Sequence, residues 1–176
     1  MKKYLVAIDL QKDFVDGALG SEQAQAIVAA AADKIRNFDG TVFATKDTHE
    51  QNYLQTAEGR KLPVPHCIRN TEGWELDKTI AQALENKKYT IVEKTTFGSV
   101  MLPELIAENA GVEDFTIELI GLCTDICVVS NALLLKASFP EKEITVDAEC
   151  CAGVTPELHN AALDTMASCQ INIVNR

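Results

Sequence analysis

Short hydrophobic segments alternate with longer amphipathic segments along almost the whole chain. The hydrophobic segments are rich in β-branched residues, and we predict strands over residues 4–10, 41–46, 89–94, 115–122, 143–148 and 170–174. Between them, hydrophobic positions recur at helical spacing, which predicts helices near residues 21–38, 75–86, 101–109, 126–138 and 156–168. Such regular alternation indicates parallel strands connected by helices.

Several predicted strands are hydrophobic at consecutive rather than alternate positions, as in Y-L-V-A-I at 4–8. That pattern is typical of strands covered by helices on both faces. We therefore predict an α/β protein: a three-layer α/β/α sandwich with a six-stranded, mostly parallel, Rossmann-like sheet, in a single domain over 1–176. The stretch from 48 to 73 is too long for an ordinary connection, and loops of that length beside a parallel sheet are usually functional.

Composition and charge narrow the class of protein. The 176 residues are 47% hydrophobic and 24% charged, as in globular proteins, and the net charge of −10 argues against a nucleic-acid partner. No hydrophobic run is long enough to cross a membrane. The chain opens with M-K-K-Y-L-V-A-I, but Asp9 interrupts this apolar stretch and no small-residue cleavage site follows. We therefore expect a cytoplasmic protein.

Polar side chains follow four of the predicted strands at the point where each strand ends. Asp9 closes the first strand, Asp47 follows the second, Lys94 ends the third, and Thr124 and Asp125 follow the fourth. In an open parallel sheet these positions share the carboxyl edge, which is where ligands bind in such folds. The sequence therefore predicts that two carboxylates, a lysine and the segment after the fourth strand meet in one crevice.

The segment after the fourth strand also supplies a candidate nucleophile. Cys127 is expected in the first turn of a helix, with Thr124 or Asp125 as its N-cap, where free N–H groups and the helix dipole favour a thiolate and a developing oxyanion. Asp9 could accept the thiol proton, and Lys94 would stabilise the charged pair.

On spacing alone, Cys127 as an ordinary core cysteine is an equally good interpretation. The spacing of the six cysteines matches neither a disulfide framework nor a zinc ribbon, and a redox pair of Cys123 with Cys127 is a further alternative.

These motifs resemble those of the isochorismatase-like cysteine hydrolases. The resemblance runs over nearly the whole chain and is carried by D-L-Q-K-D-F at 9–14, the lysine at 94, G-L-C-T-D-I-C-V at 121–128 and D-A-E-C-C-A at 147–152. It implies a catalytic triad of Asp9, Lys94 and Cys127, which favours Cys127 over Cys123 as the nucleophile. It also implies a cis peptide before Cys123 and an oxyanion hole formed by the backbone amides of Cys123 and Cys127.

The long loop carries a second group of polar residues. Asp47 and His49 form a D-x-H pair, His66 follows in P-V-P-H-C, and Glu58 lies between them. Two carboxylates and two histidines suit zinc, manganese or iron, although D-x-H alone is a weak pattern and a merely hydrogen-bonded polar loop is the alternative.

The nicotinamidase branch of the family shows a similar pattern and implies a divalent metal, with zinc expected first. Asp47, His49 and His66 match its ligands directly. The third ligand, often histidine in that branch, has no histidine here; Glu58 is the best substitute and Glu50 a weaker one. In that branch the metal binds the pyridine nitrogen and orients the amide towards the thiolate, so it acts as a template and Lewis acid.

The expected function is hydrolysis of nicotinamide to nicotinate and ammonia through a cysteine thioester. The alternatives are a metal-independent amidase acting on a carbamoyl, ureido or other small amide, an isochorismatase-type hydrolase, and a non-enzymatic thiol sensor. The resemblance also implies self-association, as a dimer or tetramer. His159 is expected at the surface and receives no role. The aromatic residues expected to sandwich a flat ring are Phe14, Tyr53, Trp74 and Phe97, with core packing as the alternative for the first and last.

Overall fold

The computed structural model describes residues 1–176 and contains one sheet of six strands in the order β3-β2-β1-β4-β5-β6. All five neighbouring pairs of strands run parallel, as the sequence pattern predicts for most of them. The strands are β1 (Lys2–Ile8), β2 (Thr41–Asp47), β3 (Tyr89–Lys94), β4 (Phe115–Leu122), β5 (Ile144–Ala152) and β6 (Asn172–Val174).

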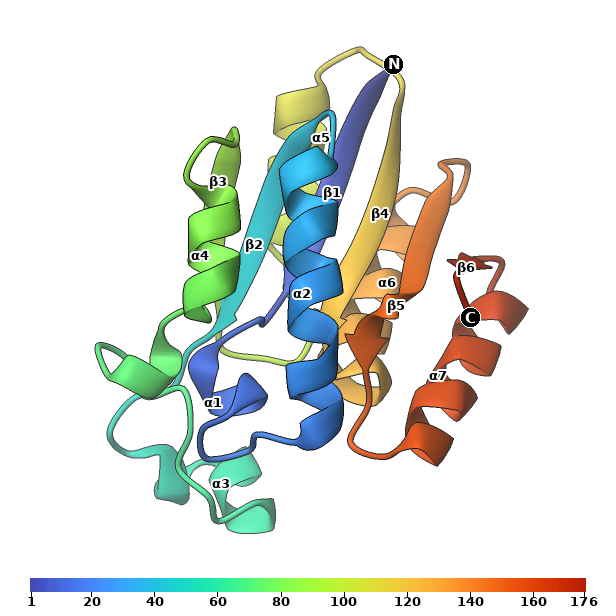
Figure 1. Ribbon diagram of the computed structural model, residues 1–176. Helices are drawn as coiled ribbons and strands as arrows, with labels where there is room; N and C mark the ends of the chain where they lie inside the picture. Colours follow the sequence, from blue (N-terminus) through green and yellow to red (C-terminus); the bar gives the residue numbers. More distant parts are fainter.

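Helices cover both faces of this sheet, so the predicted three-layer α/β/α architecture is confirmed (Figure 1). On one face α2 (Glu22–Asn37) packs beside α4 (Lys78–Leu84). On the other face lie α5 (Leu102–Ala110), α6 (Val129–Ser138) and α7 (Pro156–Ser168). Each interface has its own hydrophobic core, one of 22 buried residues and one of 20. No helix is both long and apolar enough to span a bilayer.

The predicted boundaries are exact for two strands and one helix, at 89–94, 115–122 and 156–168. Other boundaries differ: β1 ends at Ile8 rather than residue 10, and β5 continues to Ala152 instead of ending at 148. The loop at 48–73 contains a 3₁₀ turn, η1 (Tyr53–Gln55), and α3 (Ala57–Lys61), which the hydrophobic pattern did not predict. The pattern also missed α1 (Lys12–Val15) and the 3₁₀ turn η2 (Glu72–Trp74).

The two central strands, β1 and β4, end in ways that open the carboxyl edge. Asp9 has a φ of 48°, which turns the chain out of the sheet directly after Ile8. On β4, Gly121 has a φ of 123°, and a Cβ there would lie 2.1 Å from the carbonyl oxygen of Ile8. Only glycine allows this close approach. From β1 the chain continues to β2 on one side, whereas β4 lies on the other side of β1. The gap between the ends of β1 and β4 is therefore the topological switch point of the sheet, which is where ligands bind in open α/β folds.

Candidate active site

The three side chains predicted as a triad meet at the carboxyl edge, although they are remote in sequence. The Nζ atom of Lys94 lies 2.6 Å from Oδ2 of Asp9 and 3.6 Å from Sγ of Cys127. Thr45 donates its hydroxyl to Oδ1 of Asp9 at 2.5 Å and accepts the Asp9 backbone N–H at 3.1 Å. All three triad side chains are buried, with at most 5% of each residue exposed. The lysine therefore bridges the carboxylate and the sulfur in a site almost free of solvent.

Burial sets the protonation of this group. It raises the pKa of the Cys127 thiol well above its ordinary value, and the nearby Asp9 carboxylate raises it further. Burial also raises the pKa of Asp9, against the opposing effect of Lys94. For Lys94, burial alone would lower the pKa, but the charges of Asp9, Cys127 and Asp47 outweigh it and the pKa rises. The free site thus holds a protonated thiol beside a cationic lysine and a carboxyl group whose affinity for a proton is increased.

A π-helical turn, η3 (Thr124–Val128), carries Cys127 and connects β4 to α6. The peptide bond between Leu122 and Cys123 is cis, as the family resemblance implies. The predicted N-cap was wrong: the cap position is Cys123, without a side-chain cap hydrogen bond. The N–H of Cys123 donates to no acceptor in the protein, whereas its carbonyl accepts from both Ile126 and Val128. A free N–H therefore remains at the start of the turn that carries Cys127.

Neither Thr124 nor Asp125 caps the helix because both side chains are used to hold the turn. Thr124 is hydrogen-bonded to Nδ1 of His159 on α7 at 2.8 Å, and Oδ1 of Asp125 accepts the N–H of Val154 at 2.9 Å. His159 is partly buried rather than a surface residue, because it packs over this turn. The sequence did not predict the hydrogen bond between His159 and Thr124, because a single histidine on a helix does not indicate which residue it contacts.

The predicted metal ligands also converge. Asp47, His49, Glu58 and His66 each offer one ligand atom, and these atoms lie within 4.8 Å of one another. The Nε2 atom of His49 lies 2.9 Å from Oδ2 of Asp47, and the Nε2 atoms of both histidines lie 3.6 Å from Oε1 of Glu58. Glu58 is therefore part of the cluster. Glu50 is not, since its carboxylate pairs with Arg69.

The second nitrogen of His66 fixes the orientation of its ring. Nδ1 lies 2.8 Å from the carbonyl oxygen of Val64, which can only accept a hydrogen bond. Nδ1 therefore carries a proton, and Nε2 points into the cluster, the ring orientation that metal-binding histidines use. Burial alone would raise the pKa of Asp47, but its hydrogen bonds with His49 and His66 outweigh burial and lower it. The donor set is preformed and suits zinc or a similar divalent ion.

With this geometry in place, comparison with known proteins identifies the family. A family model described as "Isochorismatase domain" matches residues 3–175. The chain belongs to the isochorismatase family. The isochorismatase family protein PncA of Bacillus subtilis is 31% identical over 179 residues, covering 96% of each chain.

Solved structures of this isochorismatase-family fold include nicotinamidases and pyrazinamidases. Nicotinamidase PncA from Bacillus subtilis is similar with a TM-score of 0.84 at 28% identity, covering 98% of this chain and 99% of that one. The pyrazinamidase/nicotinamidase of Streptococcus mutans gives 0.83 at 27% identity, covering 98% and 100%. The pyrazinamidase of Pyrococcus horikoshii in complex with zinc gives 0.80 at 24% identity, covering both chains fully, a likeness that shows the fold alone.

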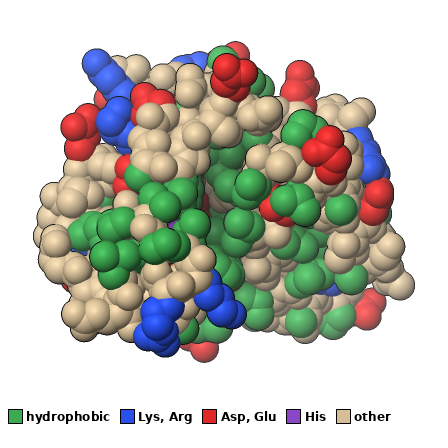
Figure 2. Space-filling view, turned by 90° about the horizontal axis from the view of Figure 1, so that it is seen from below, with side chains coloured by type: hydrophobic (Ala, Val, Ile, Leu, Met, Phe, Trp, Pro, Cys, Tyr) green, Lys and Arg blue, Asp and Glu red, His purple; other side chains and the backbone are tan.

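One cavity of about 470 Å³ reaches both Cys127 and the cluster of predicted metal ligands. Asp47, Glu58 and His66 line one part of it, and Cys123 and Cys127 line another. Seen from the carboxyl edge, hydrophobic side chains surround a groove on this face (Figure 2). The hydrophobic lining includes Phe14, Leu19, Ala24, Leu62, Phe97, Leu122, Ile126 and Val154. This volume and mixed lining are typical of a small-molecule site.

The four predicted pocket aromatics divide into two groups. Phe14 and Phe97 line the cavity, and Phe14 also packs edge-to-face on His66 with 5.5 Å between ring centroids. Tyr53 does not line the cavity. Its ring packs edge-to-face on both histidines, with ring centroids 4.7 Å apart for His49 and 5.0 Å apart for His66.

Trp74 lies in a separate hollow beside β3. Its indole N–H donates to Thr48 at 2.9 Å, and the Lys46 ammonium lies 3.1 Å from the ring centroid. The predicted placement of Trp74 and Tyr53 in the substrate cavity was therefore wrong, because nearness in sequence does not determine which side of a loop an aromatic ring faces.

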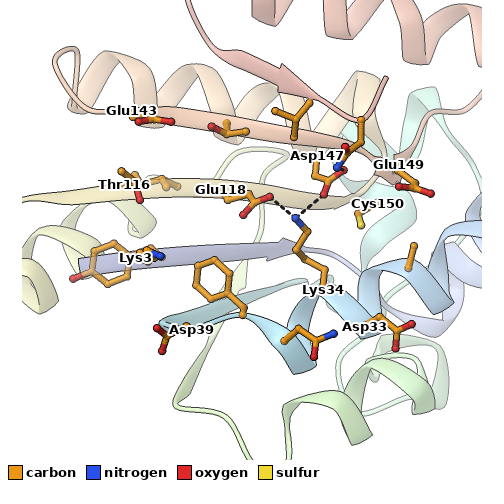
Figure 3. A pocket seen from close by; sticks show the side chains of 18 residues that line it. Lys3, Asp33, Lys34, Asp39, Thr116, Glu118, Glu143, Asp147, Glu149 and Cys150 are labelled. Atoms are coloured by element: carbon orange, nitrogen blue, oxygen red, sulfur yellow. Dashed lines mark hydrogen bonds and ion pairs between the residues drawn. The ribbon is translucent and has the colours of Figure 1, made fainter. Parts of the chain in front are cut away.

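A larger hollow of about 880 Å³ lies between α2 and the sheet, away from every predicted site residue (Figure 3). Lys34 reaches into it and pairs with Glu118 and Asp147, each at 2.7 Å. The Lys34 ammonium and the carboxylates of Glu118 and Asp147 are thus already paired with each other. Cys127 and three residues of the Asp47 cluster, namely Asp47, Glu58 and His66, line the smaller cavity instead.

Proposed function

We propose that this chain hydrolyses nicotinamide to nicotinate and ammonia, with Cys127 as nucleophile. The chain is an amidohydrolase of the isochorismatase family, and its fold neighbours are nicotinamidases and pyrazinamidases. The observation that carries the proposal is the lining of one cavity: Cys127 lies on its wall together with three of the four clustered metal ligands. Cys127 in turn contacts Lys94, which is paired with Asp9. A thiol nucleophile beside a metal site suits a substrate that has both an amide group for the thiol to attack and a ring nitrogen that can bind the metal.

The acyl transfer proceeds in two steps. Asp9 takes the proton of the Cys127 thiol, and the thiolate attacks the carboxamide carbon while Lys94 stays beside both charges. The N–H groups of Cys123 and Cys127 stabilise the oxyanion. The C–N bond then breaks, with the proton on Asp9 passing to the leaving nitrogen, and ammonia departs. Asp9 then takes a proton from the water that attacks the thioester, the C–S bond breaks, and this second proton passes to the sulfur as the acid is released.

The raised pKa values of Asp9 and Cys127 suit this proton transfer. A carboxylate with a higher proton affinity is a stronger base, and burial raises the pKa of Asp9. Lys94, at 2.6 Å from Asp9 and 3.6 Å from the sulfur, compensates the negative charge on whichever of the two is ionised. The proton can therefore move between them without leaving an unpaired buried charge.

Asp47, His49, Glu58 and His66 would hold a divalent metal, with zinc expected first and manganese or iron as substitutes. Such an ion would supply a ligand position for the ring nitrogen and would withdraw electrons from the ring. Phe14 and Phe97 provide apolar surface on the wall of the same cavity, where a flat ring would pack. The substrate would thus be held by its ring while its amide faces Cys127.

The experiment is ammonia release from nicotinamide, pyrazinamide and a set of carbamoyl amines, with metal present and after chelation. The proposal expects turnover of nicotinamide that falls on chelation and returns with zinc. Turnover of a carbamoyl compound that is indifferent to chelator would instead favour a metal-independent amidase. No ammonia from any amide would contradict both.

A further inference from the structure

A buried glutamine connects the two halves of this site. Strand β1 pairs with β2 from Tyr4 opposite Thr41 to Ala7 opposite Ala44. Beyond that point the left-handed backbone of Asp9 takes the chain out of the sheet, while β2 continues to Asp47. Asp47 is paired with β3 on its other side. On the β1 side its peptide groups therefore face a position that the neighbouring strand has left.

The side chain of Gln11 fills this position. Its Oε1 accepts the backbone N–H of Asp47 at 2.7 Å, and its Nε2 donates to the carbonyl of Asp47 at 2.9 Å. Nε2 also donates to the carbonyl of Trp74 at 2.8 Å. The Gln11 residue is completely buried. Because a side-chain amide offers one carbonyl and two N–H groups, it replaces the missing peptide partner of Asp47 and ties η2 to the same point.

The position of Asp47 matters to both parts of the site. Its Oδ2 lies 2.9 Å from Nε2 of His49, and its Oδ1 lies 3.5 Å from Nζ of Lys94. A small rotation of the Asp47 peptide would move the carboxylate relative to a metal ligand and to a triad residue together. Gln11 itself is two residues after Asp9, so the same short segment carries the proton acceptor and the residue that holds Asp47.

We propose that Gln11 is the positioning residue of the metal site: it holds the Asp47 carboxylate in its ligating orientation and aligns the site with the triad. This inference rests on the proposed function, since it requires that the Asp47 cluster binds a metal. Without Gln11 the buried N–H and carbonyl of Asp47 lose their partners, and the end of β2 must shift or admit water to satisfy them. The ligand set is then less well ordered.

The test compares Gln11→Met with Gln25→Met, a matched control because Gln25 is exposed on α2. Zinc affinity is measured by competition with a chromophoric chelator, without substrate, and the absorption spectrum of the cobalt-loaded protein reports ligand geometry. Gln11→Met should bind zinc about 10- to 100-fold more weakly and show an altered cobalt spectrum. Its kcat for nicotinamide should largely recover at saturating zinc. Gln25→Met should match the wild type.

Equal zinc affinity and an unchanged cobalt spectrum in Gln11→Met would overturn the role of Gln11 while leaving the proposed function intact. Absence of zinc binding by the wild type would instead show that the metal part of the proposed function had failed. If Gln11→Met does not fold, the proposal is tested on the wild-type protein by NMR. Zinc titration should then shift the side-chain amide resonances of Gln11 but not those of Gln25, and unmoved Gln11 resonances would contradict the proposal.

Discussion

At Cys127 the chemistry depends on a few atoms that the fold places within hydrogen-bonding reach. The thiol is almost inaccessible to solvent, and burial raises its pKa. It therefore does not lose its proton to water near neutral pH and needs a neighbouring group to accept that proton. Asp9 is that acceptor in the proposed mechanism, and Lys94 contacts both it and the sulfur. Cys123 differs in kind, because the mechanism uses only its backbone N–H.

The two cysteines should therefore respond differently to replacement by alanine. Cys127→Ala removes the nucleophile and should lower turnover of nicotinamide by at least about 10³-fold, whereas Cys123→Ala keeps its backbone amide and should stay within about tenfold of the wild type. Both are measured by ammonia release, with zinc content as a control for the intact metal site. Substantial activity in Cys127→Ala would contradict the mechanism.

Lys94 should also be important for stability. Replacing it with methionine leaves the buried Asp9 and Asp47 carboxylates without their shared cation, and we expect the free energy of unfolding to fall by about 3 kcal/mol or more. The matched control is Lys12→Met, since Lys12 pairs with Asp16 at the surface; its urea midpoint should hardly move. Similar midpoints for the two variants would show that the Asp9–Lys94 pair is not needed by the fold.

At the scale of elements, the sequence predicted what depends on periodicity. The strand 89–94, the strand 115–122 and the helix 156–168 have clear apolar patterns, and the polar side chains at the ends of the first three strands meet as predicted. Elements with fewer than two helical turns, such as α1 and α3, carry too short a pattern to detect. The π-helical turn at Cys127 also escaped prediction, because it is a change in hydrogen-bond register rather than in hydrophobic spacing.

Side-chain networks could be predicted least. The candidate site residues were found from residue type, position after a strand and the family resemblance, but the contacts of Gln11 and His159 depend on which segments the fold brings together. D-L-Q-K-D-F marks Gln11 as part of a motif without indicating its partner. Asp13, in the same motif, accepts the N–H of Cys67 next to His66 at 2.7 Å, a contact between residues 54 positions apart. Such long-range pairs have no local pattern.

The close approach of β4 to β1 gives an element-scale prediction. Gly121→Ala places a Cβ 2.1 Å from the carbonyl oxygen of Ile8 and should lower the free energy of unfolding by about 3 kcal/mol or more. Gly111→Ala is the matched control. Gly111 also has a positive φ, of 60°, but a Cβ there meets nothing within 4 Å, so its cost should be backbone strain alone, about 1–2 kcal/mol. Equal urea midpoints for the two variants would contradict the predicted clash.

For the molecule as a whole, buried cysteines and acidic charge determine the response to pH. Burial is the main cause that raises the pKa of five of the six thiols, to about 12 for Cys123 and Cys150. The others with raised pKa values are Cys67, Cys127 and Cys151. The net charge of −10 adds general repulsion that grows as further groups ionise.

Self-association as a dimer or tetramer stays a prediction.

These thiols should make the protein less stable in alkali. Above about pH 8.5 the unfolded chain releases its thiol protons while the folded protein keeps them, so the folded state binds more protons and the free energy of unfolding falls as pH rises. Each such thiol contributes about 1.4 kcal/mol per pH unit in that range. Urea unfolding in reductant at about pH 7.5 and about pH 9.5 measures the slope. Cys151→Ala should make it shallower, and an unchanged slope would contradict this account.

The most direct test of the central claim is the identity of the covalent intermediate. Enzyme mixed with nicotinamide and quenched in acid during turnover is digested and analysed by mass spectrometry. We expect a nicotinoyl group on the peptide that contains Cys127, and none on the same peptide of Cys127→Ala. A nicotinoyl group on Cys123 or another residue, or full turnover in Cys127→Ala without any adduct, would contradict the account.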